Sequence, residues 1–566
     1  MSLFGSLQLA SNSMQAQQIG LQVVGQNMAN ANTPGYSREE VQLAPAPVQR
    51  IGNITLGLGV QVTAITQQVD NFLNERLRGV NSDVGNSDAQ SKVYQNLETI
   101  VGALNDNNLQ SSLNSFFSSV SGVLNQPESV SVRNLAVLQG QTLTGDVNQM
   151  ATRVENARSD VNDQIVSMTG DINRLVSDIA KLNVQITTTE GGDTSHSQAV
   201  GLRDKRNQDL TDLSKLVGIK VEQQPSGAVN VFVGGDYLVF EGTSRQVATA
   251  YTTDGGLSAA HINLVDTNAP LDTQTGQLSG LINARDTILG GFLDKLNGFA
   301  STLNFEFNKV YSSGQGLTGF TSMTSTYPVA STSAPLDNAG LAFTPVNGSF
   351  QVQMLNTQTG LTETTNVNVD LNGLDQNETS LTGLVSQLNA INGLQATITP
   401  NGNLSLATTS PDVQFSFAKD TSGALAALGL NTFFTGSTAA DLGVNSNLAA
   451  DPGKFAASTT GVGIGTDNAT QLANFMNQPL SSAGGTTLTD VYDRMVGDVT
   501  EGSTVASSVS QGYQTFQQTL QGQQSAISGV SIDEEAVNML TFQRAYQASA
   551  KLISTINELL DTLMKL

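Results

Sequence analysis

Residues 3–28 read LFGSLQLASNSMQAQQIGLQVVGQNM, in which apolar side chains recur at alternating intervals of four and three. This spacing places one side chain per turn along one helix face and is typical of a seam that packs against another helix. The predicted N-terminal seam comprises Leu3, Leu7, Ala10, Met14, Gln17, Leu21, Val24 and Met28. We expect this helix to end near Asn30, because Thr33-Pro34-Gly35 is typical of a turn.

A second seam of the same period lies at the other end of the chain. Its members are Met539, Phe542, Tyr546, Ser549, Ile553, Ile556, Leu560 and Leu563, and the face is widened by Ala545, Leu552, Leu559 and Leu566. The helix is expected to begin at a capping box, Ser531 to Glu534. Because the two seams match in length, roughly 37–39 Å each, the sequence predicts that the terminal helices pair. The alternative is that each packs separately on a globular core.

Helical and β patterns alternate between these ends. Residues 54–62 alternate apolar and polar side chains, which predicts strand, and helix is expected from Ile65 to about Val123. The longest helical stripe consists of Val147, Met150, Val154, Ala157, Val161, Ile165, Met168, Ile172, Leu175, Ile179, Leu182 and Ile186. A later helix, about 488–522, carries a less regular stripe of Val491, Met495, Val499, Val505, Val509, Phe516 and Leu520.

The predicted fold class is α+β and multidomain, with terminal coiled-coil helices and a long helical bundle into which a β-rich outer domain is inserted. The expected organisation along the chain is an N-terminal helix 1–34, a short β segment 35–64, a helical bundle 65–190, a short helix with β-hairpins 191–275, a helix 276–312 returning to the bundle, a β-rich outer region 313–450, a linker 451–487, a bundle helix 488–530 and a C-terminal helix 531–566.

Composition excludes several function classes. The chain of 566 residues has 25 Lys and Arg against 48 Asp and Glu, a net charge of −23, which disfavours nucleic acid and anionic membrane as partners. It contains no cysteine, so disulfides, thiolate catalysis and cysteine metal sites are excluded, and its two histidines supply no obvious metal site. We therefore predict no catalytic residues, no metal and no cofactor. No stretch is apolar enough for membrane insertion.

Minor motifs have plain structural interpretations. Arg203-Asp204 and Arg285-Asp286 are expected to form local salt links at helix starts. His196 is expected to be solvated in a loop, and His261 lies in a predicted β segment in which the sequence shows no partner for it. The glycine-rich run 461–465 lacks the Lys-Ser/Thr of a phosphate loop and predicts a linker. Residues 370–375 lack the spacing of a calcium loop and predict a polar turn.

Two terminal segments resemble one protein family. Residues 25–38, GQNMANANTPGYSR, and residues 542–551, FQRAYQASAK, are similar to the N- and C-terminal signatures of the axial rod, hook and hook-associated proteins of the bacterial flagellum. The signature residues are Asn30, Asn32, Thr33, Pro34, Gly35, Tyr36, Gln543, Ala545 and Tyr546. Residues 202–217, 276–286 and 451–468 resemble the hook-associated members that join hook to filament. One departure is Gln67, where the family usually has arginine.

The resemblance implies a non-enzymatic structural subunit at the hook–filament junction. The two terminal seams, described above, become its assembly interface. Implied partners are the hook protein, the next hook-associated protein, further copies forming a ring layer, the flagellar export apparatus and an export chaperone on the C-terminal helix. The implied location is the extracellular flagellum, reached by secretion of an unfolded chain whose termini fold on assembly. The alternatives are a hook or rod subunit and, in another class, a secreted β-rich adhesin or carbohydrate-active enzyme with its site in 313–450.

Overall fold

The structure, a computed structural model, describes residues 3–51, 54–102, 109–192, 198–254, 256–374 and 378–565. Its fold is α+β and multidomain, as the sequence predicts. The chain forms two compact units. The first comprises Met1–Val93, Ser159–Arg285 and Thr504–Leu566, and the second comprises Tyr94–Arg158 and Asp286–Ser503. Three long helices contribute to both units: α2 (Asn71–Gly102), α4 (Val130–Glu190) and α12 (Leu488–Ser528).

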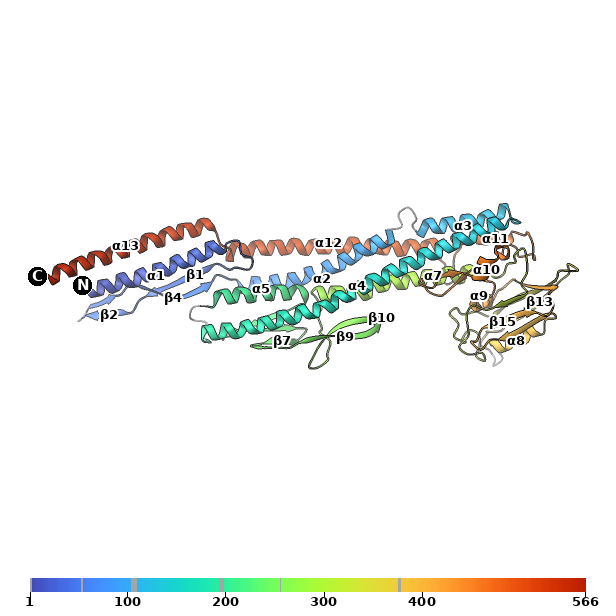
Figure 1. Ribbon diagram of the computed structural model, residues 1–566, viewed down its shortest axis with the longest axis horizontal. Helices are drawn as coiled ribbons and strands as arrows, with labels where there is room; N and C mark the ends of the chain where they lie inside the picture. Colours follow the sequence, from blue (N-terminus) through green and yellow to red (C-terminus); the bar gives the residue numbers. More distant parts are fainter. Residues whose placement is uncertain are drawn as a thin grey trace. The chain divides into compact units, whose positions relative to one another are not determined.

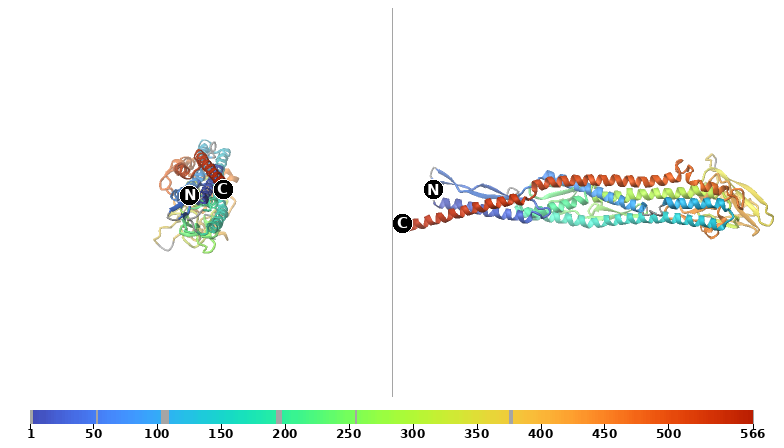
Figure 2. Two further views of the ribbon diagram at one scale, coloured as in Figure 1. Left: turned by 90° about the vertical axis from the view of Figure 1, so that its left-hand side faces the viewer. Right: turned by 90° about the horizontal axis from the view of Figure 1, so that it is seen from above.

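In the first unit, the terminal helices lie side by side. Helix α1 (Leu3–Asn30) packs along α13 (Ile532–Met564), and both ends of the chain lie at the same end of the pair (Figures 1 and 2). Helix α1 ends at Asn30 as predicted. The predicted capping box is confirmed, because the Ser531 side chain accepts a hydrogen bond from the Glu534 amide. The prediction that the two helices pair is also confirmed.

A long hairpin follows α1. Strand β1 (Glu39–Pro45) pairs antiparallel with β4 (Val60–Gln67), and β2 (Val48–Ile51) pairs with β3 (Ile54–Gly57). The prediction of helix from Ile65 is therefore wrong for residues 65–70. Pairing with Glu39 keeps the backbone extended to Gln67, and α2 begins only where the Asp70 carboxylate accepts a hydrogen bond from the Leu73 amide.

The remaining elements of the first unit are α5 (Val200–Leu216), α6 (Gln277–Asn283) and two small sheets. One sheet has the order β5-β6-β7-β8, and the other is a β9–β10 hairpin. Their strands are β5 (Lys220–Gln223), β6 (Val229–Val233), β7 (Asp236–Phe240), β8 (Thr243–Ser244), β9 (Val247–Asp254) and β10 (Leu257–Leu264).

Asparagine side chains of α4 bind these sheets. Asn173 and Val247 of β9 exchange two hydrogen bonds, amide to carbonyl in both directions, at 2.8 Å each. Asn162 bonds the Ser258 carbonyl and the Ala260 amide of β10, and Asn183 binds both backbone groups of Val229 in β6. A side-chain amide carries the same donor and acceptor as a peptide group, so each asparagine substitutes for a missing strand partner.

The second unit has an aromatic core between helices. Helices α3 (Leu109–Asn125) and α7 (Gly290–Tyr311) bring Phe116 and Phe307 together at a centroid distance of 5.5 Å, and Phe433 and Phe434 pack against both. The helix predicted over 277–312 is present but contains a π-helical turn, η1 (Ala284–Leu289), between α6 and α7.

Two three-stranded sheets form the β-rich part of the second unit, with orders β13-β12-β16 and β11-β15-β14. Their strands are β11 (Ser322–Thr324), β12 (Gly348–Asn356), β13 (Thr362–Val369), β14 (Leu394–Ile398), β15 (Leu404–Thr408) and β16 (Val413–Ala418). Helix α8 (Leu381–Asn389) contacts both sheets. The short elements are α9 (Ala424–Leu428), β17 (Phe434–Thr435), β18 (Gly443–Val444), α10 (Ser446–Ala450), η2 (Pro452–Lys454), α11 (Asp467–Ala473) and η3 (Phe475–Asn477).

The predictions for the two long apolar stripes, on α4 and α12, have different outcomes. All twelve members of the 147–186 stripe are at most 5% exposed, which confirms it as the core face of α4. In α12 the prediction is only partly right, because Val505, Val509 and Phe516 are exposed. The α2-facing side of α12 is instead largely polar, with Gln517 bonded to Asn81 and Gln514 bonded to Asp88, and Leu520 alone joins the apolar cluster of α2.

Candidate functional site

The candidate site is the surface on which α1 and α13 meet. Val24 and Ile556 are its most buried large seam residues, at 4% and 3% exposure. Ala10 and Ser549 are also buried, and Ser549 donates a hydrogen bond to the Ser13 hydroxyl at 3.2 Å. The other seam residues are half-buried, namely Leu3, Leu7, Met14, Gln17, Leu21, Met28, Met539, Phe542, Tyr546, Ile553 and Leu560. Leu563, by contrast, is 62% exposed.

Close approach of the helices depends on a glycine that the seam pattern did not include. A Cβ at Gly20 would lie 2.9 Å from two carbons of the Phe542 ring. The Phe542 ring therefore rests directly on the α1 backbone, and a side chain at position 20 would displace it. A glycine inside an apolar helix is the sequence signal that could have indicated this contact.

A second apolar stripe of α13 is exposed. It contains Val537, Leu540, Leu552 and Leu559, which are all more than 40% exposed. The sequence prediction that Leu552 and Leu559 widen the seam is therefore wrong within one chain. Leu566 lies outside the described residues.

Polar groups close the site at the end of α1. The buried Asn27 amide exchanges two hydrogen bonds with the backbone of Glu39, both 2.9 Å, and donates to the Glu535 carboxylate at 3.2 Å. The Tyr36 hydroxyl donates to Asn27 Oδ1 at 2.8 Å. Asn27 thereby connects α1, β1 and α13.

Arg38 completes this group with charge. Its guanidinium lies 2.7 Å from Glu535 Oε1 and 3.0 Å from Glu534 Oε2, so it binds two of the three acidic residues in the first turn of α13. We call Asn27, Tyr36, Arg38, Glu39, Glu534 and Glu535 the clasp. Four of these residues, Asn27, Arg38, Glu39 and Glu535, line a cavity of about 310 Å³ that also reaches Gly20 and Phe542. Burial raises the pKa of Glu39 and, together with nearby carboxylates, that of Tyr36.

Helix α5 reaches the clasp through Asp204. Gln67 Nε2 donates to Asp204 Oδ1 at 2.6 Å and also to the Val200 carbonyl at 3.1 Å. Burial and the Glu39 carboxylate together raise the pKa of Asp204 to about 6, against the opposing effect of hydrogen bonds from Ser37 and Gln67. The uncharged Gln67 side chain thus donates a hydrogen bond to the Asp204 carboxylate, whose pKa is about 6.

The remaining signature residues build the turn between α1 and the clasp. The Thr33 amide donates to the Asn30 carbonyl and the Tyr36 amide to the Thr33 carbonyl, while Gly35 adopts a positive φ of 80°. Asn32, Thr33, Pro34 and Gly35 are exposed, and Asn30 and Tyr36 are half-buried. On α13, Gln543 is exposed, and Ala545 and Tyr546 are half-buried.

The residues of the two Arg-Asp motifs have separate partners, because adjacent residues on a helix point in different directions. Arg203 forms the salt link predicted at the start of a helix, with Glu190 at 2.7 Å. Arg285 instead donates hydrogen bonds to Asn162 Oδ1 and the Ala260 carbonyl. His261 has a partner, the Thr252 hydroxyl at 2.9 Å. His196 and Asp375 lie outside the described residues.

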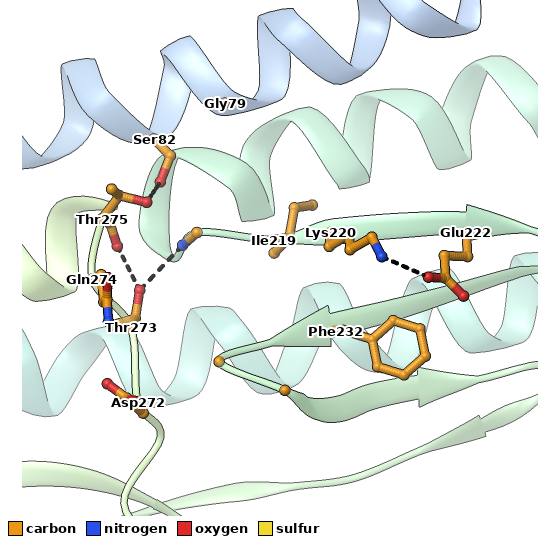
Figure 3. Close-up of a pocket in the computed structure, with 13 residues that line it drawn as sticks. Gly79, Ser82, Ile219, Lys220, Glu222, Phe232, Asp272, Thr273, Gln274 and Thr275 are labelled. Carbon is orange, nitrogen blue, oxygen red and sulfur yellow. Dashed lines mark hydrogen bonds and ion pairs between the residues drawn. The ribbon is translucent and has the colours of Figure 1, made fainter.

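A cavity of about 610 Å³ lies between α2, the β5–β6 strands and residues 272–275. Figure 3 shows the side chains that line it. Its hydroxyls bind one another: Ser82 donates to Thr275, and Thr273 donates to the Thr275 carbonyl. Lys220 pairs with Glu222 at 2.9 Å. These hydroxyl and charged groups of the lining are therefore already paired with one another.

Among the described residues, no group of three or more His, Cys, Asp or Glu is placed to hold a metal ion. No helix in the described part of the chain is long and apolar enough to cross a membrane.

Comparison with known proteins places matches along most of the chain. The flagellar hook-associated protein FlgK helical domain matches residues 94–324. The flagella basal body rod protein family matches 7–36, and the FlgEFG rod protein C-terminal family matches 521–566. Flagellar hook-associated protein 1 of Bacillus subtilis is 25% identical over 99% of this chain and 97% of its own length. This chain is similar to flagellar hook-associated protein 1 over nearly its whole length.

Other relatives of the same name cover the chain equally well. Flagellar hook-associated protein 1 of Salmonella typhimurium is 26% identical over 98% of this chain and 99% of its own length. A solved structure, the flagellar hook junction protein FlgK from Burkholderia pseudomallei, covers 80% of this chain at 15% identity with a TM-score of 0.48. The matched terminal families coincide with α1 and α13, the two helices that the clasp joins.

Proposed function

We propose that this chain is a structural subunit of the bacterial flagellum that forms the junction between hook and filament and acts without catalysis. The observation that carries the proposal is the clasp, in which Arg38 and Asn27 of the N-terminal signature region bind Glu535 of α13. Similarity to hook-associated protein 1 over nearly the whole chain supports the junction role. The match of the hook-associated helical domain to 94–324 favours it over a hook or rod subunit.

The α1–α13 pair is the proposed assembly interface. Its seam is only half-buried within one chain, and α13 carries a second exposed apolar stripe. Burying both in neighbouring subunits would contribute roughly 25 cal/mol per Å² of apolar surface. Proposed partners are the hook protein on one side, the next hook-associated protein on the other, and further copies of this chain in a ring layer.

The proposed mechanism is mechanical. The terminal helix pairs continue the inner tube of the axial structure, while the long helices and β-rich regions accommodate the mismatch between two lattices. The fully buried stripe of α4 supports a stiff element of this kind. We further propose that the chain is secreted unfolded through the flagellar export apparatus with a chaperone bound to the C-terminal helix. The absence of cysteine is compatible with that route.

The test is electron microscopy of cells that lack this chain, with an assay for flagellin in the medium. Complete hooks without filaments, accompanied by shed flagellin, are the expected result. Absent or incomplete hooks would indicate a hook or rod subunit instead. Intact filaments would overturn the junction role and direct attention to residues 313–450 as an adhesin or carbohydrate-active enzyme.

A further inference from the structure

The β-rich region of the second unit carries an unusual pair of side chains at the end of α8. Gln387 Nε2 donates to the Asn368 carbonyl of β13 at 3.1 Å, and the Asn368 amide donates to Gln387 Oε1 at 3.2 Å. Two residues later, Asn389 and Ala396 of β14 exchange the same two bonds at 2.9 and 2.8 Å. One helix thus binds two different sheets through side-chain amides.

Both strands are outermost in their sheets. β13 pairs only with β12 in the order β13-β12-β16, and β14 ends the order β11-β15-β14. An outermost strand presents backbone N–H and C=O groups that a strand of another chain can bind. Gln387 and Asn389 occupy both groups of one residue on each such edge.

The same arrangement occurs in the first unit. The β9–β10 hairpin has two edges, and α4 binds one through Asn173 and the other through Asn162. These asparagines are eleven residues apart, about three helical turns, and so lie on one face of α4. Four strand edges in two units are therefore occupied in one chemical manner.

Strand β13 shows why such occupation matters. Its sequence, TETTNVNV, has one charged residue and neither lysine nor proline, the usual features that discourage edge pairing. A two-fold antiparallel pairing of two β13 strands centred on Thr365 would place Glu363 opposite Val367 and Thr364 opposite Asn366, without like charges facing each other. The strand is thus complementary to itself. Gln387 and Asn389 are both exposed, so they add little to the apolar core beneath.

We propose that these helix amides are edge guards, which occupy the backbone groups through which the same strand of a second copy of this chain would otherwise pair. The excluded partner is another copy because β13 matches itself. The proposal rests on the sheet order and the amide geometry, and it stands or falls independently of the junction role.

The experiment uses the full chain, which contains no cysteine, with one reporter cysteine at the exposed position Thr364. A short bis-maleimide then captures β13–β13 pairs as a covalent dimer. Gln387→Met removes both hydrogen bonds while keeping a side chain of similar length. We expect the captured dimer to rise about fivefold relative to the same reporter with Gln387 intact. The matched control is Ser386→Ala, an exposed neighbour on α8 that does not bind the strand edge.

Two further variants separate guarding from simple attachment of α8. Gln387→Glu loses the donor but places a charge at the edge, so the dimer is expected to stay at the control level. Asn389→Leu with a reporter at the exposed position Gln395 repeats the test on β14. An unchanged dimer yield in Gln387→Met and in Asn389→Leu, with folding verified by circular dichroism, would overturn the proposal and leave the amides as attachments of α8.

Discussion

The stripe of α4 and the two terminal seams share one periodicity but differ in how completely they are covered. All twelve members of the α4 stripe are buried within the chain. Of the sixteen seam positions on α1 and α13, only Ala10, Val24, Ser549 and Ile556 are buried. Periodicity alone therefore indicates that a helix face packs, but burial indicates whether its partner lies within the same chain. The α4 stripe belongs to folding, and the terminal seams are suited to assembly.

The largest effect is expected in the α4 stripe. Ile165→Ala removes a fully buried side chain and should lower the free energy of unfolding by about 2–5 kcal/mol through lost transfer free energy and a cavity. Urea unfolding monitored by circular dichroism measures it. An equal loss from Leu563→Ala, at the exposed end of the terminal seam, would contradict the distinction between the two regions.

A charge in the terminal seam should affect assembly more than folding. Ile556→Asp places a carboxylate in the buried centre of the α1–α13 contact, so we expect loss of junction formation in cells while the urea midpoint of the rest of the chain stays within error. Motility and hook-tip microscopy measure assembly. Ile464→Asp, at an exposed position outside the seam, is the control, and normal filaments from Ile556→Asp would argue against the assembly interface.

The clasp is expected to give an intermediate effect. Asn27→Leu leaves the backbone groups of Glu39 and the Glu535 carboxylate without their amide partner, which should cost about 1–3 kcal/mol. Hydrogen exchange of α13 amides should accelerate, whereas that of α4 should not. Equal acceleration in both helices would mean that Asn27 supports the whole fold rather than the terminal pair.

The smallest effect is a pH dependence at Asp204. Its folded pKa of about 6 lies above the ordinary value of 3.8, so the folded chain binds this proton more tightly than the unfolded chain does. The contribution to stability is therefore fully present below about pH 3.8 and is lost as pH rises through about 6. Exchange at residues 65–67 should be slower at pH 5 than at pH 7.5 after correction for intrinsic rates.

Asp204→Asn should remove most of this difference, since an amide does not titrate. Asp171→Asn, at an exposed residue paired with Arg174, should retain it. The buried Glu39 carboxylate faces Asp204 and also has a raised pKa, so a remaining dependence in Asp204→Asn would assign the titration to Glu39.

Sequence periodicity was sufficient for the two terminal helices and the ends at Asn30 and Ser531, because a seam and a capping box are local patterns. It could not predict that Glu535 meets Asn27, since 508 residues separate them. The periodicity also misidentified the packed face of α12. Val505 and Phe516 continue the apolar period but are exposed, whereas the contact with α2 uses Gln514 and Gln517. The composition held information that periodicity does not capture. Asparagine and glutamine stand where many proteins have charged residues, and some of these side chains bind strand edges.

The contact of Phe542 with Gly20 bears on the order in which the two terminal helices form. Helix α1 contains Gly5, Gly20 and Gly25, and each glycine lowers helix propensity by about 1 kcal/mol relative to alanine. The isolated segment is thus a weak helix former, and we expect packing against α13 to stabilise its helical state. Gly20 both weakens the helix alone and admits the Phe542 ring that packs on it in the pair. The same residue therefore links formation of the N-terminal helix to the presence of the C-terminal one.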